Sequence, residues 1–372
     1  MSEIKNKRQQ WVDTAKGIAI IAVVLGHVGY LYPAWRLLPL STILVWLWHV
    51  PVFFLIGGFF LKEEKLQKPL TFVKGKFHSL YLLILYIYIP VLLLHNLFLQ
   101  IGFYNTDIEY YGKFVTEWEW VDLLNNILLA ICFGGREPLL GAMWFVYVLF
   151  LALCILSIVS WGLKRLINND DRKYEFIRFL VLLLGAVVSC TLTKLFGFTI
   201  PRGNNTIVAV WLIYVGMMLF QRLHLKFDNG FVAIISGLVA YHAATILGGA
   251  NLAANEYSDM VTLTIVSCAC LYVICYISKM IEATKAGLLM ARIGKDSFYV
   301  MGLHFIGFKV FSLILICFGC NRVLAELCPS VGSNIFMLFG YLFFGVGFPL
   351  LFMFLFRKLK YVINYCFRIP LS

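Results

Sequence analysis

The chain has 372 residues, of which 61% are hydrophobic and 13% charged, and its formal net charge is +12. Soluble globular domains carry roughly 25% charged and about 45–50% apolar residues, so this composition excludes a soluble domain and indicates a polytopic membrane protein. The positive charge does not indicate a nucleic-acid partner, because the basic residues fall in short loops between apolar runs, where they set membrane orientation. We therefore expect the lipid bilayer, and no nucleic acid, as a partner.

The first apolar run, WVDTAKGIAIIAVVLGH, carries Asp13, Lys16 and His27. Eleven helical residues turn through roughly 1100°, so Lys16 and His27 share one helix face roughly 16 Å apart, with Asp13 one turn below Lys16. Such a stripe is costly in a membrane unless it faces a protein interior or a wet cavity, which makes it a candidate functional site. The alternatives are a hydrogen-bonded core histidine and a lysine that snorkels to the cytoplasmic boundary.

Apolar stretches near the spanning length of roughly 17–25 residues recur along the whole chain. They cover residues 14–32, 41–61, 79–101, 141–163, 177–197, 205–223, 230–249, 260–280, 297–319 and 332–356. Lys and Arg gather before the first stretch and after each even-numbered one, which places both termini in the cytoplasm. The expected fold class is an all-α polytopic helical bundle of about ten transmembrane helices, forming a single domain over residues 1–372.

The connection after the third stretch is long and is expected outside. Residues 123–133 are apolar but too short to span, and counting them as a span would put the later basic loops outside, so we expect an outer-surface or re-entrant helix there. Residues 105–122 before it are acidic and aromatic, and long loops often carry function. A cleaved signal peptide is not expected at the N-terminus, because Asp13 and Lys16 interrupt the apolar run.

Two further histidines lie inside apolar runs. His49, in HVPVFFLIGGFF, reaches a depth similar to that of His27; Pro51 is expected to kink this helix and Gly57 and Gly58 to allow close helix approach. The alternative for His49 is an incidental histidine in a packing motif. His304, in IGKDSFYVMGLHF, lies about 10 Å from the cytoplasmic end by helical rise, at a different depth from the other two.

Residues near the start of the fourth stretch offer an acid and an aromatic pair. Glu137 is a candidate second acid or base near the outer ends of the first two spans, or else a solvated loop residue. Trp144 and Phe145 begin the stretch at the outer boundary, where an interfacial aromatic anchor is the default interpretation.

The sequence contains no motif for metal, nucleotide or serine-hydrolase chemistry. Neither the ten cysteines nor the membrane histidines have metal-ligand spacing, so we expect no metal. Cys320 and Cys328 flank a short outer loop and could form a disulfide. A general base without a metal or a triad suits the transfer of an activated group to a hydroxyl, in which the base takes the proton of the attacking oxygen.

Four of these segments resemble motifs of the acyltransferase type 3 family, in the family's order. The first run resembles its first-helix signature, a basic residue eleven positions before a histidine, here Lys16 and His27. HVPVFFLIGGFF resembles the second-helix motif, with Gly57 where serine is usual. MWFVYVLF and IGKDSFYVMGLHF resemble two later elements. The first run looks most like the fucose 4-O-acetylase branch.

The resemblance implies a membrane O-acyltransferase of the bacterial inner membrane. It would move an acetyl group from cytoplasmic acetyl-CoA to a hydroxyl of an extracytoplasmic carbohydrate or lipid-linked sugar. His27 would be the general base and Lys16, oriented by Asp13, would meet the donor. His49 and Glu137 are further candidates for the outer site, and His304 for the donor passage. The chain departs from the family's basic pair entering the third helix, where it has Lys76 and His78; Lys74 and Lys76 are expected to replace that pair in holding the donor's phosphates.

Two other classes of protein fit a polytopic chain with buried titratable residues. A proton-coupled transporter or flippase would normally show inverted repeats or paired broken helices, and the sequence shows no such repeat. A sensor or scaffold that uses the membrane only as an anchor would carry a soluble domain, which the sequence lacks.

Overall fold

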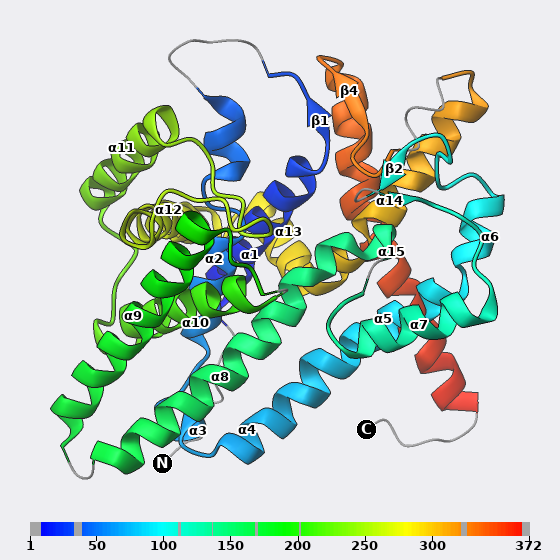
Figure 1. Cartoon of the computed structure of the whole chain (residues 1–372). Coiled ribbons are helices and arrows are strands. Elements are labelled where there is room, and N and C mark those ends of the chain that lie inside the picture. The colour runs from blue at the N-terminus through cyan, green and yellow to red at the C-terminus, as the bar shows by residue number, and fades with distance from the viewer. Residues whose placement is uncertain are drawn as a thin grey trace.

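The computed structural model describes residues 9–32, 39–110, 113–135, 137–167, 170–200, 202–320 and 326–366. For residues 363–366 it describes the backbone alone. Over these residues the chain is mainly helical, with two small two-stranded sheets, β1–β4 and β2–β3. Eight helices in this part are long and apolar enough to cross a membrane. The predicted all-α membrane bundle is therefore confirmed (Figure 1).

The elements of the first half are α1 (Gln10–Gly26), β1 (Gly29–Tyr30), η1 (Thr42–Trp46), α2 (Pro51–Phe59), α3 (Glu63–Leu66), α4 (Pro69–Lys76), η2 (Phe77–Tyr81), α5 (Leu82–Leu93), α6 (His95–Gln100), β2 (Glu109–Tyr110), β3 (Lys113–Phe114), α7 (Trp120–Ile131), η3 (Pro138–Met143) and α8 (Trp144–Ile167). Those of the second half are α9 (Asp171–Phe196), α10 (Gly203–Met217), η4 (Met218–Arg222), α11 (Gly230–Ile246), α12 (Met260–Ile281), α13 (Lys285–Lys295), α14 (Ser297–Cys317), β4 (Ser330–Gly332) and α15 (Ile335–Cys366).

Eight of the ten predicted spans correspond to the long apolar helices. The other two are α1 and α11, each of 17 residues, at the lower limit for crossing a bilayer. The predicted short helix at 123–133 is present as α7, with 12 residues. Lys5, Lys7 and Arg8, on which the predicted orientation partly rests, lie outside the described residues.

Two predicted boundaries are wrong in ways that move candidate residues. The first helix ends at Gly26 rather than 32, so His27 follows it as the C-cap, and the chain then continues as strand β1 beside β4. The third span begins at Pro69 rather than 79, because proline at the first helical position favours helix initiation. Lys74 and Lys76 therefore lie on helix α4, not in a loop.

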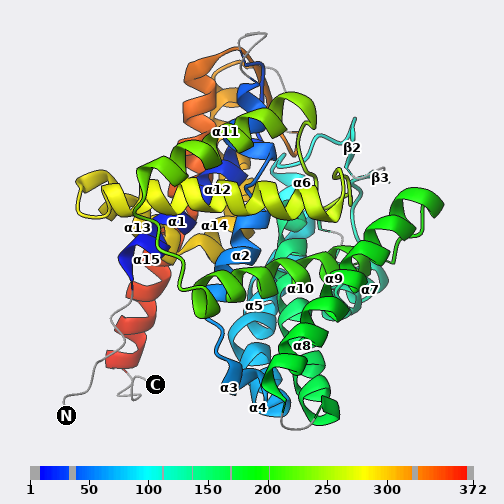
Figure 2. The same cartoon turned by 90° about the vertical axis from the view of Figure 1, so that its left-hand side faces the viewer.

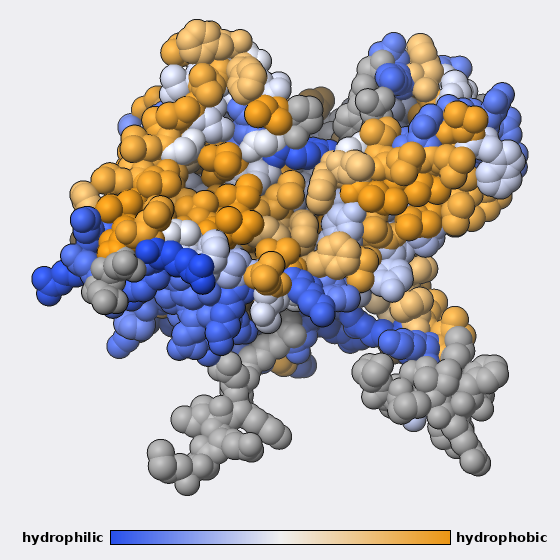
Figure 3. Space-filling model, turned by 60° about the horizontal axis from the view of Figure 1, so that its bottom comes forward, coloured by the Kyte–Doolittle hydropathy of each residue, from blue (hydrophilic) through white to orange (hydrophobic). Residues whose placement is uncertain are grey.

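The surface separates into apolar and polar regions. Figure 3 shows hydrophilic residues gathered along the underside of the molecule and a broad hydrophobic surface above them. Large apolar side chains are exposed on several helices, including Leu184 on α9 (58%), Phe231 on α11 (71%) and Phe343 on α15 (73%). Water would penalise such a surface and lipid would not, which agrees with a membrane-spanning bundle.

Glycines allow the central helices to approach closely. A Cβ at Gly17 of α1 would lie 2.0 Å from the carbonyl oxygen of Met290 in α13, and a Cβ at Gly294 would lie 1.8 Å from the Asp13 carbonyl oxygen. Only glycine fits at such a crossing. Gly58 of α2 meets the backbone of α10 in the same way, which confirms one of the two predicted packing glycines.

The helices around this crossing enclose the candidate residues. Helix α1 packs against α12, α13 and α14, and α14 packs against α15. Figure 1 shows α8 running beside the α4–α5 helix, and Figure 2 shows α11 and α12 lying across the face of the molecule turned toward the viewer. The end of α1 is therefore surrounded by protein rather than by lipid.

A buried arginine of α9 links this helix to α3 through ion pairs. Arg178 of α9, fully buried, donates to the Glu63 carboxylate of α3 at 2.8 Å and to Glu175 at 2.7 Å. Arg222 pairs with the other oxygen of Glu175. Desolvation would raise the pKa of Glu63, but the Arg178 charge and hydrogen bonds outweigh it and hold this pKa below its usual value. We call these four residues the inner ion network.

Candidate functional site

A polar cavity of about 840 Å³ lies at the end of α1 and is lined by residues of α6, α7, η3, α8 and the β3 region. We call it the outer cavity, because the 105–131 segment that covers it is the loop that the Lys and Arg pattern places outside. Its lining includes His27, His95, Glu137, Trp144 and Arg202. A cavity with a few convergent polar groups is the usual form of a small-molecule site.

His27 lies between this cavity and the protein core. As the C-cap of α1 it lines the cavity, and its ring stacks on that of His304 at a centroid distance of 5.1 Å. The ring of Phe305 packs against it edge-on at 4.8 Å. Its Nδ1 lies 3.8 Å from the sulfur of Cys328. If Nδ1 carries the proton and donates to sulfur, Nε2 keeps the lone pair that a base needs.

His304 lies at the level of His27, so the prediction of a different depth is wrong. The reason is where α14 begins. Gly294, just before α14, touches α1 between Asp13 and Gly17, and about ten helical residues separate Gly17 from His27 and Gly294 from His304. Equal rises from a shared level bring the two rings together.

The His304 side chain is fully buried and only half satisfied. Its Nδ1 lies 2.9 Å from the Val300 carbonyl oxygen and 3.0 Å from that of Met301, so Nδ1 is the nitrogen that carries a proton and donates. Its Nε2 then presents a lone pair and has no hydrogen-bond partner among the described residues. A buried polar atom in that state indicates a place for a ligand or a water.

Glu137 is buried, so its interpretation as a solvated loop residue is wrong. One of its oxygens lies 2.8 Å from His95 Nδ1, and the other accepts from the Tyr104 hydroxyl and from the Leu139 amide. Desolvation and the neighbouring carboxylate raise the pKa of Tyr104 far above its usual value, so its hydroxyl remains a donor. His95 is clamped from two more sides, by the Thr116 carbonyl and by Trp118, whose ring stacks on it at 3.6 Å.

Sequence reasoning missed His95 and Tyr104 as partners of Glu137. Glu137 lies 33 positions after Tyr104 and 42 positions after His95. No spacing rule predicts contacts over such separations. The only available signal was His95 itself, a histidine among apolar residues at the outer end of the third predicted span.

His49 lies in the turn between η1 and α2, where Pro51 interrupts the helix as predicted. Its Nδ1 lies 2.8 Å from the Val45 carbonyl oxygen, and the ring packs edge-on against Trp46 at 5.5 Å. The side chain is buried and near enough to His27 for an electrostatic interaction. The rings of His27 and His304 therefore stack, and His49 lies in their neighbourhood, in the turn before α2.

Lys16 and Asp13 lie at the other end of α1. Lys16 Nζ is 3.1 Å from the Asp13 carboxylate, which is buried, and 5.1 Å from the centroid of the Phe60 ring. The predicted pairing of the two residues is therefore present. Lys16 is not among the residues that line the outer cavity, so α1 carries a charged pair at one end and a cavity-lining imidazole at the other.

Lys74 and Lys76 lie on α4, on the same side of the bundle as the inner ion network. Lys74 is exposed, and Lys76 Nζ lies 5.3 Å above the ring of Phe72. Neither lysine is among the residues that line the outer cavity.

Lys309 and Cys328 lie near the outer cavity and His27. Lys309 of α14 donates to the Glu326 carbonyl oxygen at 2.6 Å and lies 5.6 Å above the ring of Tyr110, which lines the outer cavity. Cys320 and Cys328 are both free thiols, so the suggested disulfide is absent. Desolvation raises the pKa of the Cys328 thiol to about 11, so it is protonated near neutral pH.

Comparison with known proteins gives one match. A family model described as an acyltransferase domain matches residues 9–358, nearly the whole chain. No curated protein and no solved structure matches the chain.

Proposed function

Because the chain belongs to the acyltransferase type 3 family, we propose that it moves an acetyl group from cytoplasmic acetyl-CoA to a hydroxyl of an extracytoplasmic carbohydrate, with His27 as the general base. Family membership makes it a membrane acyltransferase; the donor, the acceptor, the base and a bacterial inner-membrane location are our proposal. Membership also favours an enzyme over the transporter that the sequence alone left open.

The observation that carries the proposal is the position of His27. It is the one titratable residue of α1 that lines the outer cavity, and on its inner side it stacks on His304. In the proposal, the acceptor hydroxyl would enter through the cavity, and the thioester of the donor would reach His27 from the side of His304. Lys16, paired with Asp13 in the N-terminal half of the same helix, would offer its ammonium group to the polyanionic end of the donor.

The proposed chemical step needs a general base for the acceptor hydroxyl. His27 Nε2 would take the proton of the acceptor hydroxyl as its oxygen attacks the thioester carbonyl carbon. The new C–O bond forms, the C–S bond of acetyl-CoA breaks, and the CoA thiolate leaves and takes up the proton. Such positioned proton transfer contributes typically 10²–10⁴-fold to a rate, and a partly desolvated site strengthens it.

The neighbouring imidazoles would position the reactants. His304 Nε2, with its unused lone pair, would accept a hydrogen bond from the acceptor hydroxyl or from an amide of the pantetheine arm. His49 would act on His27 electrostatically. These are positioning roles, because the proton acceptor in the proposal is His27.

Glu137 and His95 would bind the acceptor at the far wall of the cavity. Both line it, and each is held by partners that leave little freedom to the side chain. Carbohydrates offer several hydroxyl donors, and carboxylate and aromatic groups such as Glu137 and Trp118 suit them. Trp144 lines the same cavity, so we assign it to acceptor binding rather than to an interfacial anchor.

The experiment is O-acetylation of surface glycans, followed by mass spectrometry in cells that produce or lack the protein. We expect the mass increments of acetyl groups only in producing cells, and their loss in cells with His27→Gln at the same membrane level. Equal acetylation with and without the protein would contradict the proposal.

A further inference from the structure

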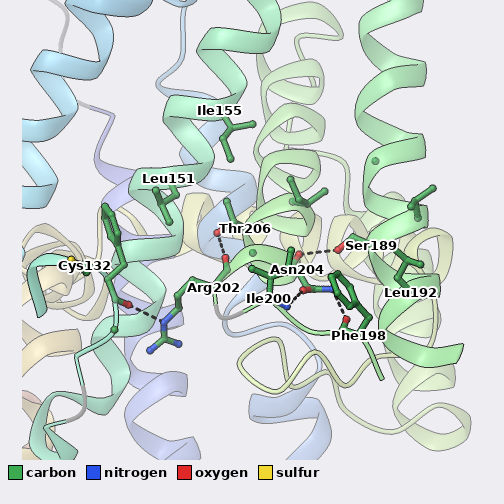
Figure 4. Close-up of a pocket in the computed structure, with 16 residues that line it drawn as sticks. Cys132, Leu151, Ile155, Ser189, Leu192, Phe198, Ile200, Arg202, Asn204 and Thr206 are labelled. Atoms are coloured by element: carbon green, nitrogen blue, oxygen red, sulfur yellow. Dashed lines mark hydrogen bonds between the residues drawn. The ribbon is translucent and has the colours of Figure 1, made fainter. Parts of the chain in front are cut away.

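A second hollow of about 510 Å³ lies between the membrane-spanning helices α8, α9 and α10, beside the outer cavity. Figure 4 shows Leu151 and Ile155 of α8 on one side of it and Ser189 and Leu192 of α9 on the other. We call it the helix groove. Its lining is apolar, and Arg202 is the charged residue among its described lining residues.

The polar side chains of the groove are used to build it. Asn204 donates to the Thr193 hydroxyl. It also donates to the Phe198 carbonyl oxygen, and its own side-chain oxygen accepts from the Ile200 amide (Figure 4). Ser189 donates to the Asn204 carbonyl oxygen. These bonds hold the outer end of the groove and leave an apolar wall. The side chains of Val188, on the candidate membrane span α9, and Ile200, just after it, also line the groove and are about half exposed, at 53% and 54%.

The groove and the outer cavity meet at one cation. Arg202 lines both hollows, and its Nε lies 3.5 Å from the Phe133 carbonyl oxygen at the end of α7. The wall between them is a single stretch of chain, since Phe133 and Gly134 line the groove and Gly135 lines the cavity. In Figure 4 the Arg202 side chain reaches toward this stretch, next to Cys132.

We propose that the helix groove holds the hydrocarbon tail of the acceptor, a lipid-linked sugar whose phosphate binds Arg202 and whose sugar enters the outer cavity. The order of the chemistry along the surface matches such a molecule: apolar wall, fixed cation, polar cavity with His27. Guanidinium is the side chain best suited to phosphate, through paired hydrogen bonds. The inference deepens the proposed function and depends on it for the group transferred.

A bulk phospholipid would also fit an apolar groove with a cation, but its headgroup would have no reason to enter the cavity. The shared position of Arg202 favours an occupant that continues past the phosphate into the space beside His27. The inference therefore requires that the groove bind a polyprenyl phosphate more tightly than an ordinary phospholipid.

The test uses Cys132, a free and exposed thiol in the groove lining, as a reporter. The purified full chain in detergent is treated with N-ethylmaleimide in the presence of undecaprenyl phosphate, the uncharged polyprenol, or dioleoylphosphatidylglycerol, and the modified peptide is followed by mass spectrometry. We expect undecaprenyl phosphate to slow Cys132 modification at least tenfold, and the other two lipids to slow it less than threefold.

Two variants separate the tail from the phosphate. Gly185→Leu fills the groove, because a Cβ there meets only the Ile207 side chain at 3.8 Å, and we expect it to abolish protection. Gly162→Leu on α8 is the matched control, since a Cβ at Gly162 meets nothing within 4 Å and the residue does not line the groove. Arg202→Asn suits the left-handed backbone at this position (φ 63°) and should make undecaprenyl phosphate no better than the polyprenol.

Equal protection by phosphatidylglycerol, or no protection by any lipid, would overturn the inference. A second arm measures acetyl transfer to one sugar offered free and offered on a polyprenyl phosphate. We expect Gly185→Leu to raise KM at least tenfold for the lipid-linked form alone; an equal change for both forms would also overturn it. Absence of transfer to either form counts against the proposed function, while Cys132 protection still judges the groove.

Discussion

The chain buries two clusters of polar side chains, and their difference separates structure from chemistry. In the inner ion network, Arg178 gives its terminal nitrogens to Glu63 and Glu175, and neither Arg178 nor Glu63 lines the outer cavity or the helix groove. In the other cluster, formed by the histidines near the outer cavity, His27 lines the cavity and His304 keeps a lone pair without a described partner. In the inner ion network opposite charges pair and stabilise a helix junction, although Arg178 Nε has no partner among the described residues. In the other cluster His27 faces a cavity that a substrate can enter, with His304 buried behind it.

The first test of this comparison replaces His304. His304→Phe keeps the ring and its stacking but removes both nitrogens, so we expect acetyl transfer to fall about a hundredfold, the size of a lost hydrogen bond of ~1.5–3 kcal/mol to a reacting group. The measurement is kcat and KM of the purified enzyme. His242→Phe, at an exposed histidine of α11, is the control. A loss under threefold would mean that His304 only packs.

The second test breaks the inner ion network. Glu63→Gln should lower the free energy of unfolding by about 2 kcal/mol at neutral pH, less than the ~3–5 kcal/mol of a fully buried pair because 30% of the Glu63 side chain is exposed. Activity per folded molecule should remain. The measurement is thermal unfolding in detergent, with the exposed Glu64→Gln as control.

The same pair makes a prediction about pH. The folded state lowers the pKa of Glu63, so its stabilisation is complete above the unfolded-state value of 4.5 and is lost as the pH falls through the folded-state value. The stability difference between the wild type and Glu63→Gln should therefore shrink below about pH 4.5. A difference that grows on acidification would contradict the ion pair.

The third test concerns Lys16 and Asp13, in the N-terminal half of α1. Lys16→Gln should raise KM for acetyl-CoA about tenfold and change kcat less, if the lysine binds a donor phosphate. Lys16→Arg should restore most of the affinity. Because Lys16→Gln removes the Lys16 ammonium that pairs with the buried Asp13 carboxylate, Asp13→Asn combined with Lys16→Gln separates lost binding from lost folding. An unchanged KM in both variants would remove Lys16 from the donor site.

The fourth and smallest effect is expected at Cys328. A thiol whose pKa is about 11 is a poor nucleophile at neutral pH, so we expect it only to orient the His27 ring. Cys328→Ser keeps a hydrogen-bonding group and should reduce kcat less than threefold. Loss of activity beyond a hundredfold would indicate an acyl-cysteine intermediate, which intact-protein mass spectrometry after incubation with acetyl-CoA would detect.

The sequence predicted the bundle well because hydropathy and basic residues are summed over whole segments. Single residues were harder. Helix period predicted the Asp13–Lys16 pair, which is present, whereas the helix ends one residue before His27. The level of His304 could not be read from its distance to the cytoplasmic end, because the glycine crossing of Gly17 and Gly294 sets where α14 begins. Nor could spacing show that Glu137 meets His95 across a loop.

The most direct measurement of the central claim is acetyl transfer by purified His27→Gln. The account predicts a fall in kcat of about 10²–10⁴-fold, with thermal stability and acetyl-CoA binding close to those of the wild type and of the control His242→Gln. Activity within tenfold of the wild type, in a variant that folds and binds the donor, would show that another group takes the proton.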